Sequence, residues 1–192
     1  MNNKKHSKSS KHWLWRFILL SLFVFMVGVG LNLRTYQALT KETAVATISF
    51  KQQSTQTFIA TLTLADKSPI NFMLQGDEWQ LDAKMVKWKP LQVIFGTPAI
   101  FRVERLSGRY FDIQKERQQA KTAYQISTDE GLSIWKMLCQ VSQRMSAVDA
   151  VYGSAVYLPM KNQAAYDVSM GLTGLVARPS NQKASNAVYQ WQ

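Results

Sequence analysis

The chain is poor in the residues that most enzymes and metalloproteins use. It has 192 residues, with one cysteine and two histidines. The single cysteine, Cys139, excludes an internal disulfide and any metal site built from paired cysteines. Both histidines, His6 and His12, lie near the N-terminus, so the remaining sequence has no imidazole for general-base catalysis or metal binding. We therefore expect no catalytic triad within one chain, no metal site and no cofactor.

Acidic residues are also few, and long apolar runs are scarce. The chain carries 23 lysines and arginines against 12 aspartates and glutamates, a formal charge of +11. One apolar run, from Trp13 to Leu33, is long enough to cross a bilayer: as a helix it spans about 31 Å, against about 30 Å of hydrocarbon. A single span cannot enclose a transport pathway by itself. The overall composition, 46% apolar and 18% charged, is typical of a globular domain.

The N-terminal segment has the pattern of an uncleaved membrane anchor. Residues 1–12 form a basic tail without acids, and residues 13–33 form the predicted transmembrane helix. The positive-inside rule places the tail in the cytoplasm and exports the rest, which predicts a bacterial inner-membrane protein with a periplasmic domain and no nucleic-acid partner. The alternative is a cleaved signal peptide. Ala44-Val45-Ala46 matches a cleavage pattern, but it lies about ten residues beyond the apolar run.

Period-two alternation dominates the exported part. After a polar stalk at residues 34–43, apolar residues recur at every second position in segments 46–50, 58–64, 70–74 and 79–85. These segments predict four half-buried strands. Because Gly76-Asp77 has the composition of a tight hairpin, we expect the four strands to form an antiparallel meander with one packed face.

The second half of this domain, which extends over residues 44–178, is less regular. Residues 97–107 fit either a helix or a strand with Phe101 and Val103 on its buried side, and we favour the strand. A capping threonine and two acidic residues begin a helix near residues 129–147, in which Cys139 packs in the core. Residues 179–192 predict a flexible tail. The predicted fold is one transmembrane helix followed by an α+β, mainly antiparallel β, exported domain.

Four segments resemble a known family. They are WQLDA from Trp79, ERLSGRY from Glu104, VDAVYGSA from Val148 and GLTGLVARP from Gly171. With these segments the chain resembles a family of small, single-span bacterial envelope proteins of unassigned function, some of which carry the automatic label cation/multidrug efflux pump. The resemblance covers most of residues 75–180. It implies a membrane-anchored envelope domain, with an accessory role in an efflux assembly as one alternative, and it brings no site residues.

Within the exported part, residues Lys84 to Lys121 carry an excess of positive charge, with nine lysines and arginines against three acids. Outside a bacterial membrane the available polyanions are lipid head groups, lipopolysaccharide phosphates and acidic glycans. On a helix Arg102, Arg105 and Arg109 would share a face, whereas on a strand Arg102 and Arg105 would point oppositely. The alternative is a solvated basic surface with local pairs such as Glu104 with Arg102. The candidate residues for binding an anionic surface are Arg102, Arg105, Arg109, Lys84 and Lys87.

Three acids, Asp77, Glu78 and Asp82, lie at or just after the Gly76-Asp77 turn. A glycosidase uses two carboxylates about 5 to 10 Å apart, although acids at a turn are more often ordinary surface. We expect a non-catalytic envelope protein whose exported domain binds a partner protein or an anionic envelope component. The alternatives are an efflux accessory subunit and a tethered cell-wall glycan enzyme that works with acids alone. A cleft that gathers aromatics and carboxylates would favour the enzyme.

Overall fold

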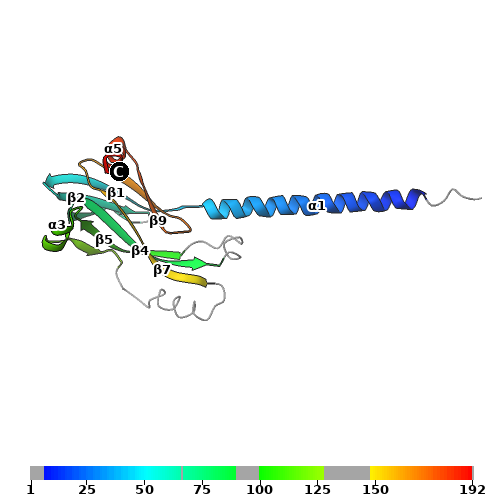
Figure 1. Ribbon diagram of the computed structural model, residues 1–192, viewed down its shortest axis with the longest axis horizontal. Helices are drawn as coiled ribbons and strands as arrows, with labels where there is room; N and C mark the ends of the chain where they lie inside the picture. The colour runs from blue at the N-terminus through cyan, green and yellow to red at the C-terminus, as the bar shows by residue number, and fades with distance from the viewer. Residues whose placement is uncertain (1–6, 66, 90–99, 128–147, 192) are drawn as a thin grey trace, which may run out of the picture. The chain divides into compact units, whose positions relative to one another are not determined.

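The computed structural model describes residues 7–65, 67–89, 100–127 and 148–191, and the chain divides into two compact units, Met1–Thr40 and Lys41–Gln192 (Figure 1). The first unit contains helix α1, Ser7–Thr40. Within α1, Trp13–Leu33 is long and apolar enough to cross a membrane, with a mean hydropathy of 2.2 and none of the span buried. The helix continues through most of the segment that the sequence analysis assigned to a stalk.

The second unit consists of two antiparallel sheets and two short helices among the residues that the structure describes. Sheet A has the strand order β3-β2-β1-β8-β9, and sheet B has the order β6-β5-β4-β7. This confirms the mainly antiparallel β domain. The elements in chain order are β1 (Thr43–Ser54), β2 (Thr57–Leu64), β3 (Ile70–Gln75), β4 (Glu78–Trp88), β5 (Ile100–Arg109), α3 (Ile113–Gln118), β6 (Ala123–Gln125), β7 (Val148–Pro159), β8 (Ala165–Met170), β9 (Leu175–Pro179) and α5 (Gln182–Trp191).

An aromatic layer joins the two sheets. The ring of Trp79, on β4 of sheet B, lies 6.1 Å from that of Phe50 on β1 and 5.6 Å from that of Tyr166 on β8, between ring centroids. All three side chains are buried. The Tyr166 hydroxyl donates a hydrogen bond to the Pro159 carbonyl at 2.7 Å, and burial raises the pKa of this tyrosine to about 12. Each large apolar side chain that is fully buried contributes about 1.5–3 kcal/mol, so this layer is a main source of cohesion between the sheets.

The four predicted strands are present, but the prediction that they form one meander was wrong. Strands β1, β2 and β3 pair in sequence in sheet A, whereas β4 joins sheet B between β5 and β7. The crossing is made at Gly76, which has a φ of 138° and lies so close to β5 that a Cβ atom there would be 2.2 Å from the Arg109 carbonyl oxygen. A glycine turn indicates that the chain reverses, but it does not fix whether the next strand pairs in the same sheet or joins the facing one.

Strand β5 confirms the strand that we favoured over residues 97–107, within the described part that begins at Ile100. Asp82 pairs with Arg105 and Ala83 with Val103, so Glu104 is an extra residue that forms a β-bulge. The bulge shifts the alternation by one residue. Arg102 and Arg105 therefore lie on the same outer face of sheet B, and the expectation that a strand would point them oppositely was wrong.

The C-terminal segment is also different from its prediction. Residues 179–192, expected to be a flexible tail, contain α5, in which Ala184 and Ala187 are buried. The Asn181 side chain caps this helix by accepting a hydrogen bond from the Ala184 backbone N–H at 2.9 Å. The small side chains of these alanines let the helix approach the sheets closely. The polar composition of the segment gave no indication of this packing. The helix predicted near residues 129–147, with Cys139, lies outside the described residues.

Candidate functional site

Four of the five predicted basic residues gather on the outer face of sheet B. Lys84 on β4 lies opposite Arg102 on β5, and Glu78 lies opposite Arg109. Arg105 lies between these two arginines on the same strand. The fifth residue, Lys87, is exposed three positions beyond Lys84. The structure therefore assembles most of the predicted cluster, on a strand and by means of the bulge.

These cations are paired with acids on the same face, which we call the charge ladder. The Glu104 carboxylate is 3.1 Å from Lys84 Nζ and 2.5 Å from Arg102 Nε. Arg105 is 2.7 Å from the Asp82 carboxylate. Exposed pairs of this kind contribute about 0–1 kcal/mol each, and they reduce the field that a distant polyanion would meet. A hollow of about 770 Å³ lies over this face. The ladder residues are Lys84, Arg102, Arg105 and Arg109 with Glu78, Asp82 and Glu104.

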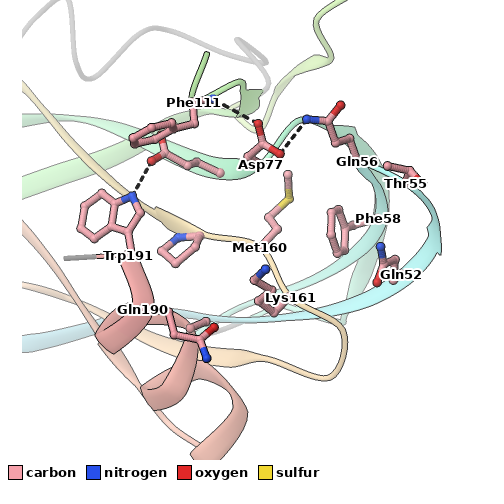
Figure 2. A pocket seen from close by; sticks show the side chains of 13 residues that line it. Gln52, Thr55, Gln56, Phe58, Asp77, Phe111, Met160, Lys161, Gln190 and Trp191 are labelled. Atoms are coloured by element: carbon pink, nitrogen blue, oxygen red, sulfur yellow. Dashed lines mark hydrogen bonds between the residues drawn. The ribbon is translucent and has the colours of Figure 1, made fainter. Parts of the chain in front are cut away.

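A second hollow, of about 430 Å³, lies at the end of the sheets opposite the start of β1, and we call it the distal cleft (Figure 2). Its walls come from the β1–β2 turn, the start of β4, the segment after β7 and the last turn of α5. Figure 2 places Phe111 and Trp191 on one side and Gln52, Thr55 and Gln56 on the other. The lining residues are Gln52, Thr55, Gln56, Phe58, Asp77, Glu78, Phe111, Pro159, Met160, Lys161, Ala187, Gln190 and Trp191.

Asp77 ties two walls of the distal cleft together. Its carboxylate accepts a hydrogen bond from Gln56 Nε2 at 2.7 Å and one from the Phe111 backbone N–H at 3.2 Å (Figure 2). Its own backbone N–H donates to the Arg109 carbonyl at 2.8 Å. The β1–β2 turn and the end of β5 are therefore fixed to each other through one acidic side chain.

Glu78 holds the C-terminal helix in the same way. Its side chain is buried, and Oε1 accepts a hydrogen bond from Trp191 Nε1 at 2.7 Å. Oε2 lies 3.7 Å from Arg109 Nε, and the Arg109 guanidinium lies 4.3 Å above the Tyr157 ring. A buried carboxylate is tolerated only with such partners, because removing its charge from water is costly. Glu78 thus serves to dock α5 against the two sheets.

Other groups of the distal cleft are open to a ligand. The Phe111 side chain is 72% exposed although its backbone is held in place. Among the described residues, the side chains of Gln190 and Lys161 make no hydrogen bond or ion pair. The cleft thus gathers aromatic rings and carboxylates, as the glycan-enzyme alternative would require, but the carboxylates face donors of the chain itself. Within the described ranges, no group of three histidine, cysteine or acidic residues is placed to hold a metal ion.

The sequence analysis selected Asp77 and Glu78 but missed the aromatic side of the cleft. Trp191 was assigned to a flexible tail, and Phe111 was not considered. A signal for Trp191 was present, because Ala184, Ala187, Val188 and Trp191 follow the i, i+3, i+4, i+7 spacing of a helix face. All four are buried or pack against the core. Phe111 had no comparable signal, since its position depends on the contact with Asp77.

The fold and the cleft define an antiparallel two-sheet β domain that follows a helix able to span a membrane. No family model, curated protein or solved structure matches the chain. The resemblance to the single-span envelope family therefore stays a prediction.

Proposed function

We propose that the chain is a membrane-anchored, non-catalytic binding protein of the bacterial cell envelope. Its span from Trp13 to Leu33 and the basic residues before it support an inner-membrane anchor with the β domain in the periplasm. The observation that carries the binding role is the distal cleft. Its acids are engaged by the protein itself, while its mouth presents an exposed ring, an amide and an ammonium group.

The geometry favours binding over catalysis. A general acid or base must reach the proton that it transfers, at about 2.6–3.2 Å. In the distal cleft, Asp77 receives hydrogen bonds from Gln56 and Phe111, and Glu78 receives one from Trp191. A substrate would have to displace these donors and loosen α5 and the β1–β2 turn. The tethered glycan enzyme is therefore the less supported alternative.

The other two predicted roles receive less support. Binding to an anionic surface through Arg102, Arg105, Arg109, Lys84 and Lys87 has to compete with the ion pairs of the charge ladder. An accessory role in an efflux assembly would be favoured by a long helical hairpin that projects from the membrane. No such hairpin occurs in the described part of residues 41–192.

Site-specific crosslinking in intact cells tests the proposed function. A photoreactive amino acid at Gln190, in the distal cleft, should give a covalent adduct with an envelope component. The same amino acid at Tyr189 is the matched control, because Tyr189 is the neighbouring residue and is 83% exposed but does not line the cleft. Adducts at both positions alike, or at neither, would count against a binding role for the cleft.

Topology requires a separate measurement. A phosphatase that folds only in the periplasm should be active when it is fused after Gln192, and the mature protein should keep Met1 or Asn2. Activity of a cytoplasm-specific reporter at the same position would invert the assignment. A new N-terminus near Leu31 or Thr47 would mean that the anchor is a cleaved signal.

A further inference from the structure

Two edge strands of the β domain are partly closed to an added peptide strand. On β3, the Met73 carbonyl accepts a hydrogen bond from the Tyr124 hydroxyl at 2.9 Å, and the Gln75 N–H donates to Thr122 Oγ1 at 2.9 Å. On β9, the Leu175 N–H donates to Ser154 Oγ at 2.9 Å. Main-chain groups on an open edge are what strand addition uses. These contacts reduce the number of main-chain groups that β3 and β9 offer to an added strand.

The distal cleft combines an apolar floor with a rim of amides. Phe58 and Met160 line the cleft and are buried, whereas the ring of Phe111, which also lines it, is exposed. Gln52 and Gln190 add side-chain amides, each of which can donate and accept hydrogen bonds. A ligand that fits must offer an apolar face together with closely spaced hydroxyl or amide groups. A sugar ring has this combination, with its C–H face on one side and its hydroxyls around the edge.

The charge and the volume of the distal cleft further restrict the class of ligand that it can bind. The carboxylates of Asp77 and Glu78 accept hydrogen bonds from the chain itself, so they present little free negative charge. Lys161 adds one ammonium group at the side of the cleft where Gln190 lies (Figure 2). A ligand with several charges has no complementary set of partners here. The volume of about 430 Å³ falls near the lower end of the usual range for small-molecule sites, about 300–1,000 Å³, which suits one or two sugar rings.

The cleft is also held in shape before any ligand arrives. Asp77 fixes the backbone of Phe111 and the side chain of Gln56, and Glu78 fixes the indole of Trp191. Preorganised walls reduce the ordering cost of binding. This matters for a small polar ligand, which has few contacts to offset that cost.

We infer that the distal cleft binds a short carbohydrate of one or two rings, either uncharged or with a single carboxylate that faces Lys161. The inference rests on the proposed function and names the ligand class for that same cleft. Phe111 supplies the stacking surface, Gln190 a hydrogen-bonding amide, and Lys161 the partner for an acidic substituent.

Ligand-detected NMR on the full chain tests this inference. The protein is held in amine-oxide micelles, because sugar-based detergents would compete for the cleft. The probes are the β-1,4-linked disaccharide of N-acetylglucosamine and the disaccharide in which N-acetylmuramic acid, with one carboxylate, replaces one ring. Saturation should transfer from the protein to both sugars. Phe111→Ala and Gln190→Ala should each weaken binding about fivefold to tenfold, as expected for the loss of one contact worth about 1 kcal/mol or slightly more.

Matched variants separate the cleft from the rest of the surface. Tyr189→Ala removes an aromatic side chain outside the cleft that is even more exposed than Phe111, and it should leave binding unchanged. Lys161→Gln should weaken binding of the carboxylated disaccharide, by at most the about 1 kcal/mol that an exposed charge pair contributes. Binding of the uncharged disaccharide, which forms no such pair, should stay within about twofold. Unchanged unfolding midpoints for Phe111→Ala and Gln190→Ala would ensure that a loss of binding is local.

The outcomes distinguish this inference from the proposed function. Absence of transfer to both disaccharides, or equal loss in Phe111→Ala and Tyr189→Ala, would overturn the carbohydrate site. Capture of a polypeptide by a crosslinker at Gln190, with no sugar binding, would reject the ligand class while the binding role stands. A cytoplasmic reporter result would reject the proposed function, even where the sugar titration succeeds.

Discussion

The replacement Gly108→Ala addresses a corner where β5 of sheet B approaches β3 of sheet A closely. Gly108 lies near the end of β5, and a Cβ atom there would be 2.0 Å from the Gln75 carbonyl oxygen at the end of β3. Its backbone N–H donates to the Thr122 carbonyl at 3.0 Å, and the Gln75 N–H donates to Thr122 Oγ1 at 2.9 Å. The obstacle is backbone on both strands, so no side chain can rotate away to make room.

The expected cost follows from this contact. The two strands must separate by more than about 1 Å, which overpacking data place at about 1–3 kcal/mol. The corner hydrogen bonds contribute about 1 kcal/mol each and weaken when the strands part. We therefore expect a loss of about 2–5 kcal/mol in the free energy of unfolding. For a domain of this size this corresponds to a fall of about 5–15 °C in the melting temperature.

The measurement is thermal unfolding of the full chain, followed by near-ultraviolet circular dichroism of the buried aromatic layer. Gly153→Ala on β7 is the matched control, because a Cβ atom there has nothing within 4 Å. This control should be neutral or slightly stabilising, since glycine in a strand costs about 0.5–1 kcal/mol relative to alanine. A melting temperature for Gly108→Ala within about 2 °C of the wild type would refute the close approach of β3 and β5, because that shift is under about 1 kcal/mol.

Two further predictions concern the links between distant parts of the chain. Trp191→Phe should lower the free energy of unfolding by about 1–3 kcal/mol in a denaturant titration, because it removes the N–H group that donates a hydrogen bond to Glu78. The control variant Tyr189→Phe should have almost no effect in the same titration. Hydrogen bonds from Arg178 and Ser169 lower the pKa of Glu42 from 4.5 to about 2. The contribution of these bonds to the stability of the folded domain is therefore fully present above pH 4.5 and is lost as the pH falls through 2. The difference in unfolding midpoint between the wild type and Arg178→Gln should therefore shrink between pH 4.5 and pH 2, and a difference independent of pH would contradict it.

The individual strands could be predicted because each one carries its own pattern. Phe58, Ala60 and Leu62 recur at every second position, with Thr61 and Thr63 on the opposite face, and all three apolar residues are buried on β2. The same rule located β1, β3 and β4. The rule describes one strand at a time, however, and it does not say which sheet a strand joins. That depends on the path of the chain at Gly76, where the contact with the Arg109 backbone exists only in the folded domain.

The candidate site was less predictable because its parts are far apart in the sequence. Glu78 and Trp191 are separated by 113 positions, and Asp77 and Phe111 by 34. Sequence patterns located the acids at their turn, but the donors that engage them come from other elements. The bulge at Glu104 is similar, since an extra residue in β5 becomes visible only against the register of β4.

A variant of Glu104, the bulge residue, directly tests the predicted binding of the charge ladder to an anionic surface. Glu104 is the carboxylate that Lys84 and Arg102 share, so Glu104→Gln removes the negative charge that pairs with both and raises the charge of the ladder by one. If this face binds lipid phosphates, residues 41–192, which form their own compact unit, should bind anionic vesicles about fivefold more tightly, as expected for about 1 kcal/mol per basic residue near the surface. Asp167→Asn is the control, because it removes an exposed acid from β8 of sheet A and changes the net charge equally. Equal gains for the two variants would mean that net charge alone acts, and that the ladder is a set of surface ion pairs with no binding role.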